Sequence, residues 1–439
     1  MVNLKKLLRP GTIALRIIRS TIRILFRWTG YMAVLIPWIL INAWFARLFA
    51  NRNSPSRLVW GSTPIHNLAL WSRAMRAGGW QSETFTRPHF SMHQREDWDR
   101  ILTEEYPGRS QYVASHLAFV KSLWAYDVFF IPMNGFFLGF ESNKFAPNLL
   151  RRFHGYLLKF ARKKVVILPY GADAYVYRRI RSVALTHGLM TSYPVLAREQ
   201  RAIAKDVDFW TDIADAVIPG VMGRDGIGRW DLLVPSAACV DLEFWRPSNR
   251  TNRSDGRSGQ VVIAHAPNHR GFKGTEFVIR SVRQLQEEGL SVELRLIEGL
   301  SLREVRDVLS SDVDILVEQL VTFGHGLNGV EGMASSLPVV SNLEDQEFRD
   351  FLDSYTFYGE CPIVSANPSK LTSALRDLVA NPEKRNRLGH AGRDYVERWH
   401  SPTESRRAFE AIIRFVEGDV FALKNFYHPL AEEIPPEKR

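Results

Sequence analysis

Two loops of this 439-residue chain combine basic residues, glycines and a carboxylate in a way that suits an anionic ligand. In the first loop, Arg270 and Lys273 stand three residues apart in a glycine-bearing turn. An arginine binds a phosphate through two parallel hydrogen bonds and a lysine binds it as a point charge, so this pair suits a diphosphate. The competing interpretation is that two basic residues in a loop are simply solvated.

The second loop joins two short apolar runs, 315–317 and 337–340, which are typical of buried parallel strands. A short helix is expected from Asn328 to Ser335. Its amides and dipole would attract a phosphate, and the glycines before and within its first turn would let a ligand approach the backbone: Gly324, Gly326 and Gly329. The loop therefore predicts a phosphate site.

Glu331 lies near the start of this helix. Its carboxylate is either stabilised by the helix dipole or accepts hydrogen bonds from a sugar hydroxyl, and both interpretations stay open. The segment 324–329 also satisfies the dinucleotide fingerprint G-x-G-x-x-G. An acidic residue should then follow about 20 residues later, whereas Glu344 and Asp345 come too soon. A nucleotide sugar is the favoured ligand.

These motifs resemble the donor-binding segment of retaining family 4 glycosyltransferases, which carry a Glu, seven residues, Glu pattern before a Pro-Val strand. Glu331 matches the second Glu, and Phe323 occupies the position of the first. The run 318–320 and the pair His325-Gly326 resemble a bacterial polysaccharide-synthesis branch that also lacks the first Glu. The resemblance implies that Arg270 and Lys273 bind the diphosphate, that Glu331 holds the ribose, and that His325 is the first candidate to replace the missing contact.

The first half of the chain supplies the candidate acceptor side. Gly61 and Ser62 form a turn between an expected strand at 58–60 and a helix at 65–77. Tyr170 and Asp173 follow an expected strand at 165–168, and ligands of open parallel sheets bind at the carboxyl ends of strands. A similar turn in the related enzymes has a histidine where Tyr170 stands. Asp173 is a candidate for contacting an acceptor hydroxyl; it equally suits a helix cap.

The alternation of short apolar runs and helices predicts an α/β protein with two facing Rossmann-like domains, the GT-B glycosyltransferase architecture that the resemblance implies. We divide the chain into a membrane-association segment (1–50), an acceptor domain (51–247), a linker (248–260), a nucleotide-sugar domain (261–400), and a crossover helix with a tail (401–439). The active site is expected in the cleft between the domains.

The first fifty residues are basic and apolar. No acidic residue precedes Glu83, and the stretch Trp28–Ala46 carries no charge. This pattern predicts a basic amphipathic helix on an anionic membrane, followed by a segment that re-enters the bilayer by bending at Pro37 or lies within one leaflet. A full pass and a helix packed on its own domain are the alternatives. We expect the protein at the cytoplasmic face of the inner cell membrane.

Together these features predict a retaining glycosyltransferase that transfers a sugar from a nucleotide sugar to a lipid-linked glycan or glycolipid in cell-surface polysaccharide synthesis. No cofactor, metal or nucleic acid is expected, and the two cysteines, Cys239 and Cys361, build no disulfide framework. The candidate catalytic residues are Asp173 and His325. The alternatives are an epimerase acting on a nucleotide sugar and a non-catalytic membrane scaffold with the same fold.

Overall fold

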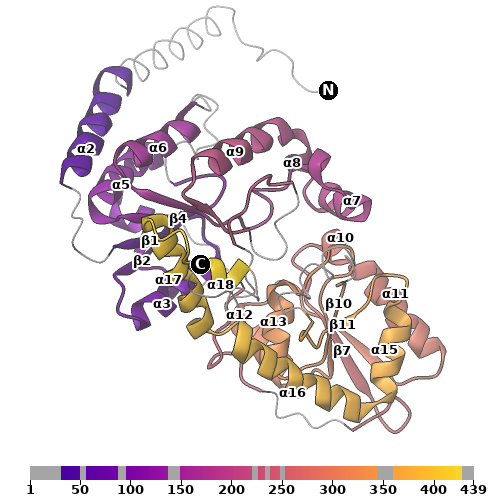
Figure 1. Ribbon diagram of the computed structural model, residues 1–439. Coiled ribbons are helices and arrows are strands. Elements are labelled where there is room, and N and C mark those ends of the chain that lie inside the picture. The colour runs from indigo at the N-terminus through magenta and orange to yellow at the C-terminus, as the bar shows by residue number, and fades with distance from the viewer. Residues whose placement is uncertain are drawn as a thin grey trace, which may run out of the picture.

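A computed structural model describes residues 31–49, 56–87, 95–136, 149–219, 226–232, 238–247, 253–343 and 359–427. Most of the expected membrane segment, the first part of the linker and the end of the tail lie outside these residues. The described chain forms two α/β domains, each built on a parallel sheet (Figure 1), as the apolar runs predict. The domain bounds assigned from the sequence stay predictions.

The first domain contains a six-stranded parallel sheet in the order β3-β2-β1-β4-β5-β6. Its strands are β1 (Leu58–Ser62), β2 (Ser82–Thr86), β3 (Arg100–Ile101), β4 (Val128–Ile131), β5 (Lys164–Ile167) and β6 (Ala216–Val217). Its helical elements are η2 (Tyr31–Leu35), α2 (Ile36–Leu48), α3 (His66–Ala77), η3 (Arg95–Asp97), α4 (Leu102–Glu105), α5 (Gln111–Ala125), α6 (Leu149–Phe160), η4 (Tyr177–Arg179), α7 (Val183–Ser192), α8 (Pro194–Arg198) and α9 (Gln200–Ile213).

The second domain contains a five-stranded parallel sheet in the order β11-β10-β9-β7-β8. Its strands are β7 (Val261–His265), β8 (Val292–Leu296), β9 (Ile315–Val317), β10 (Val339–Ser341) and β11 (Val364–Ser365). The helices that follow the linker are α10 (Arg270–Lys273), α11 (Thr275–Glu287), α12 (Leu302–Ser311), α13 (Gly326–Ala334), α15 (Leu371–Ala380), α16 (Pro382–Trp399), α17 (Pro402–Glu417) and α18 (Lys424–Tyr427).

Alternating side chains of the first sheet serve two separate cores. Val59 and Phe129 face the helices α2, α5, α6 and α9, whereas Trp60 and Phe130 face α3 and α17. Helix α17 comes from the end of the chain, yet Phe409 packs edge-on against Trp60 with 4.9 Å between ring centroids. The last long helix therefore completes the core of the first domain, beside α3 (Figure 1).

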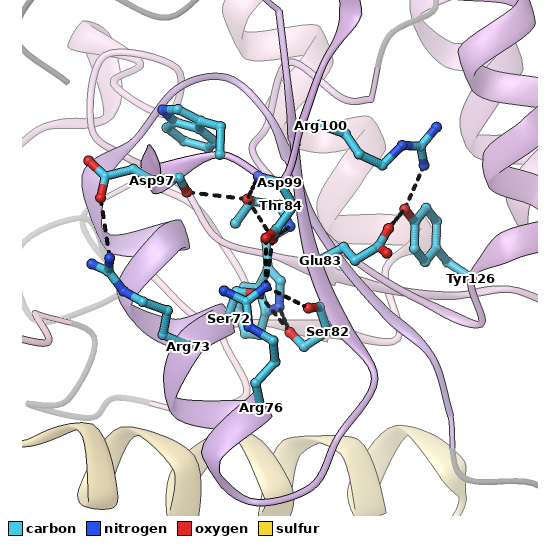
Figure 2. A network of polar contacts seen from close by, with 12 residues as sticks. Ser72, Arg73, Arg76, Ser82, Glu83, Thr84, Asp97, Asp99, Arg100 and Tyr126 are labelled. Carbon is cyan, nitrogen blue, oxygen red and sulfur yellow. Dashed lines mark hydrogen bonds and ion pairs between the residues drawn. The ribbon is translucent and has the colours of Figure 1, made fainter. Parts of the chain in front are cut away.

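Strand β2 lies between β1 and the edge strand β3, and polar contacts on both of its faces hold it there (Figure 2). On one face, Asp99 Oδ2 accepts hydrogen bonds from Thr84 N at 2.8 Å and from Arg76 at 2.7 Å. On the other face, Tyr126 donates to Glu83 and accepts from Arg100 at 2.6 Å. These side chains pair with one another, so the network fixes the short strands β2 and β3 that the sequence analysis did not predict.

The N-terminal apolar segment forms a helix that lies on the first domain. The buried side chains Ile39, Ala43 and Ala46 of α2 join the core shared with α5 and α6. Pro37 is the second residue of α2, and the backbone is helical before it, in η2, and after it. The expected reversal at Pro37 is therefore wrong within residues 31–49. Among the described helices, none is both long and apolar enough to cross a bilayer.

Candidate functional site

The glycine turn between β9 and α13 is fixed by hydrogen bonds from both sides. Gln319 Nε2 donates to the carbonyl oxygens of Phe323 and Gly324, each at 3.0 Å, and Ser341 Oγ donates to the Gly324 carbonyl at 2.7 Å. Gly324 N donates in turn to the carbonyl oxygen of Asn342 at 2.8 Å. These four hydrogen bonds fix the conformation of the turn.

The turn needs glycine for a reason that the sequence analysis missed. A Cβ on Gly326, whose φ is +55°, would lie 1.9 Å from Glu318 Oε1, and a Cβ on Gly329 would lie 3.1 Å from Glu318 Cγ. Gly324 has a φ of +102°, a backbone conformation that favours glycine. The bare backbone thus makes room for an internal carboxylate at the end of β9.

Glu318 binds the buried lysine of the first loop. Lys273 Nζ lies 2.5 Å from Glu318 Oε1 and 3.1 Å from Gln319 Oε1. Glu318 is 1% exposed, and its Oε2 has no hydrogen-bond partner among the described residues. Lys273 is therefore held at the glycine turn by the run 318–319, which the resemblance singled out without giving it a role.

Arg270 does not share this position. Its guanidinium makes ion pairs with Glu276 at 2.7 Å and with Glu298 at 3.1 Å, and 43% of its side chain is exposed. The structure thus gives the two basic residues different carboxylate partners. A ligand that engaged both would have to draw Arg270 away from two exposed ion pairs, which contribute little stability.

Glu331 is buried on α13. It lies in the second turn of this helix, because the helix begins at Gly326, two residues before the expected start at Asn328. The helix dipole acts mainly on the first turn, so its stabilisation of this carboxylate is small. Burial, helped by the nearby charge of Glu318, raises the pKa of Glu331 to about 8, although Asn328 Nδ2 lies 3.4 Å from Glu331 Oε2. Glu331 is mainly protonated at neutral pH.

His325 precedes α13 and is 2% exposed. Its ring packs edge-on against the ring of His400, with 4.9 Å between centroids. Burial lowers the pKa of His325 to about 4, so its imidazole is neutral at physiological pH. A neutral ring can exchange hydrogen bonds with a sugar hydroxyl, but it adds no charge for a phosphate.

Phe323, at the position of the family's first Glu, packs into an apolar cluster formed between the two domains. The other members come from the loop after β5, from α7 and α8, and from α10, and they are Tyr175, Tyr177, Ile180, Leu185, Leu189, Tyr193, Leu196, Ala197 and Phe272. Phe272 N also donates to Ser192 Oγ at 2.9 Å. A carboxylate at position 323 would be poorly accommodated beside these apolar side chains.

Asp173 lies at the carboxyl ends of β4 and β5, where its carboxylate joins two loops. Its oxygens accept hydrogen bonds from the backbone amides of Met133 at 2.9 Å, Tyr170 at 3.0 Å and Gly171 at 3.1 Å. Burial raises the pKa of Asp173 to about 6 against the opposing effect of these bonds. The contacts describe a residue that positions loops, and they differ from the helix cap that we considered.

Beside these loops, polar side chains come together from three strand ends: Thr63 is buried, Asn134 is half-buried and Tyr170 is exposed. Thr63 Oγ1 lies 3.4 Å from Asn134 Oδ1, and Asn134 Nδ2 donates to Tyr170 Oη at 3.3 Å. Gly61 and Ser62 lie deeper: a Cβ on Gly61 would meet the Phe85 carbonyl oxygen at 1.9 Å, and Ser62 is fully buried. Of the predicted acceptor residues, Tyr170 is therefore the one that offers a hydroxyl at the surface.

Replacing Asp173 by Asn is expected to lower the free energy of unfolding by about 1 to 3 kcal/mol. Both carboxylate oxygens accept from backbone amides, so the Asn nitrogen must face at least one donor, and this loss outweighs the removal of a buried charge. Urea unfolding of both proteins measures the difference. Asp208→Asn is the matched control, since Asp208 is exposed and pairs with Arg179 at 2.7 Å, and it should change stability by less than about 1 kcal/mol. Equal losses in the two variants would contradict the positioning role.

No protein-family model matches the chain, and no curated protein matches it. Among solved structures, a sucrose-phosphate synthase from Thermosynechococcus elongatus is similar with a TM-score of 0.53 and 13% identity, over 82% of this chain and 98% of the synthase. An alpha-glucosyltransferase in complex with UDP and DNA is similar with a TM-score of 0.52 and 9% identity, over 83% of this chain and 100% of that one. The chain has the GT-B fold.

Within this GT-B chain, the described residues contain no group of His, Cys, Asp and Glu side chains arranged to hold a metal ion. At such low sequence identities, the structural similarity establishes the fold and nothing further. An activity therefore has to be argued from the side chains that lie at the carboxyl ends of the strands.

Proposed function

We propose that the protein is a retaining glycosyltransferase of the bacterial polysaccharide-synthesis branch of family 4, which transfers a sugar from a nucleotide sugar to a lipid-linked glycan or glycolipid at the cytoplasmic face of the inner membrane. The observation that carries the proposal is the buried Lys273, held by Glu318 beside the hydrogen-bonded glycine turn at the end of β9. A fixed cation and the amides of α13 would stabilise the diphosphate as it leaves.

In this mechanism each of these residues has a separate role. Lys273 binds the diphosphate, and Arg270 swings from its exposed carboxylates to join it. Glu331 holds the ribose, and the neutral His325 contacts the donor sugar. Tyr170 and Asn134 receive the acceptor, with Asp173 fixing their loops. Transfer to the same face as the leaving group requires no protein nucleophile, cofactor or metal.

A thermal-shift panel with UDP, GDP, ADP and their sugar conjugates tests the donor site. A nucleotide at about 100 times its dissociation constant should stabilise the protein by about 2.7 kcal/mol. Glu331→Ala should lose most of this gain, whereas Glu304→Ala, which removes the exposed capping box of α12 with Ser301, should keep it. Absence of a shift with every nucleotide would favour the scaffold alternative.

Product analysis separates the transferase from the epimerase. Incubation with the donor that stabilises the protein, with and without a membrane extract, should give a glycosylated lipid only when the extract is present. Release of an epimer or of free nucleotide without any acceptor would contradict glycosyl transfer. The anomeric configuration of the new linkage, read by NMR, tests retention.

A further inference from the structure

Helix α2 presents apolar side chains to solvent on the face that does not pack on the first domain. Its large exposed residues are Leu40, Ile41, Trp44, Phe45 and Leu48, and they are joined by the C-cap residue Phe49, which is 70% exposed. We call these six residues the α2 face. An exposed apolar surface of this kind on one helix marks a site of interaction with a membrane or a protein.

The apolar surface continues from the α2 face onto the neighbouring helices. Phe49 stacks on Trp124 of α5 with 6.4 Å between ring centroids, and the Arg47 guanidinium lies 5.4 Å from the ring centroid of Phe160 in α6. Trp124 Nε1 also donates to Asn42 Oδ1 at 3.1 Å. Trp124 and Phe160 are each 41% exposed. Three helices that lie side by side (Figure 1) therefore share one aromatic surface.

The three helices of this surface carry only basic charges, and two of these charges pair with carboxylates of neighbouring elements. Glu105 pairs with Lys121, and Asp215 pairs with Lys159 at 2.6 Å, which leaves Arg47 as the cation beside the aromatic rings. The sequences of α2, α5 and α6 contain no Asp or Glu, while Arg47, Lys121 and Lys159 are among their basic residues. Seven more basic residues precede α2 in the chain: Lys5, Lys6, Arg9, Arg16, Arg19, Arg23 and Arg27. Tryptophan and phenylalanine on a helix that follows a strongly basic segment and itself carries no carboxylate are the composition that favours an anionic lipid interface.

We infer that the α2 face, with Trp124 and Phe160, docks the first domain flat on an anionic bilayer, with α2 lying in the plane of the interface. Ile39, Ala43 and Ala46 hold α2 on the protein, so a spanning arrangement would require the helix to leave its domain. The inference deepens the proposed function by naming the surface that brings the site to a membrane-linked acceptor. Its test uses no nucleotide, so failure of docking is distinguishable from failure of the donor site.

Sedimentation of the full chain with vesicles tests the surface. We expect binding to phosphatidylglycerol-containing vesicles and much weaker binding to pure phosphatidylcholine. The variant Ile41→Ser/Trp44→Ser/Phe49→Ser should bind at least tenfold more weakly, while Val183→Ser/Met190→Ser/Val195→Ser, which removes exposed apolar residues from α7 and α8, stays within twofold. An α2 variant that binds as the wild type does, or a wild type that binds no vesicle or self-associates through this face, would overturn the inference.

Depth measurements separate an in-plane helix from a spanning one. Single cysteines at Val34 and Leu48, about 20 Å apart along the helix, can carry an environment-sensitive dye in a Cys361→Ser background, since Cys239 is buried. Lipids brominated at defined depths should quench both dyes equally and near the headgroups, and should leave a dye at Val183→Cys unquenched. Quenching of the two dyes at different depths would reject docking in the plane. A dye that is already shielded from water when no vesicles are present would do the same.

Discussion

Replacing Lys273 by Met is expected to lower the free energy of unfolding by about 3 to 5 kcal/mol, because it leaves Glu318 buried without its cation. Glu318 is 1% exposed and its Oε2 already has no partner among the described residues. Chemical denaturation of the purified protein measures this change. Arg270→Met is the matched control, since its two ion pairs are exposed, and it should cost no more than about 1 kcal/mol.

The double variant Lys273→Met/Glu318→Gln decides whether the loss comes from the uncompensated carboxylate. Removing both charges should recover most of the stability that Lys273→Met alone loses, so the double-mutant cycle should give a large coupling energy. Nucleotide binding should nevertheless stay weak, because the cation for the diphosphate is still absent. A double variant as unstable as Lys273→Met would show that packing of the lysine stem, and not the ion pair, dominates.

Replacing Glu331 by Gln is expected to stabilise the protein increasingly as pH rises. The folded pKa of about 8 lies above the ordinary value, so the folded protein binds more protons than the unfolded chain between about pH 4.5 and 8. Stability of the wild type therefore falls with rising pH through this window. Gln is uncharged and avoids this loss, which is on the order of 3 kcal/mol at pH 7.

Unfolding curves of the wild type and Glu331→Gln at several pH values measure this dependence. The difference between the two proteins should vanish near pH 4.5 and grow towards pH 8. Glu304→Gln is the control with the opposite sign, because hydrogen bonds from Ser301 lower the pKa of Glu304, and its stabilising effect is lost as pH falls. A pH-independent difference for Glu331→Gln would contradict its protonation in the folded state.

The two α/β domains with parallel sheets could be predicted from the sequence, because their apolar strand segments and turns are recognisable from neighbouring residues alone. The strands β1, β5 and β9 lie close to their predicted runs. The helices α5 and α6 and the strands β2 and β3 were missed, since β2 carries polar residues that pair with side chains distant in sequence.

The candidate site was predictable in its place but not in its internal contacts. The glycine turn and Lys273 lie together, as the loops suggested, whereas the partner of Lys273 is a carboxylate from the end of β9 that spacing alone does not identify. The environment of Glu331 was also not predicted. The helix α13 begins two residues earlier than expected, so this carboxyl group lies in the second helical turn, where it is buried, and not in the first. Such effects depend on tertiary contacts.

The position of α17 has a consequence for the order in which the protein is made. Phe409, Ile412 and Val416 belong to the core beneath β1 and β4, but the ribosome adds them only after the whole second domain. The first domain is therefore synthesised first and completed last. Its apolar face stays uncovered while the whole second domain emerges, so the first domain is the one we expect to need protection by a chaperone during translation.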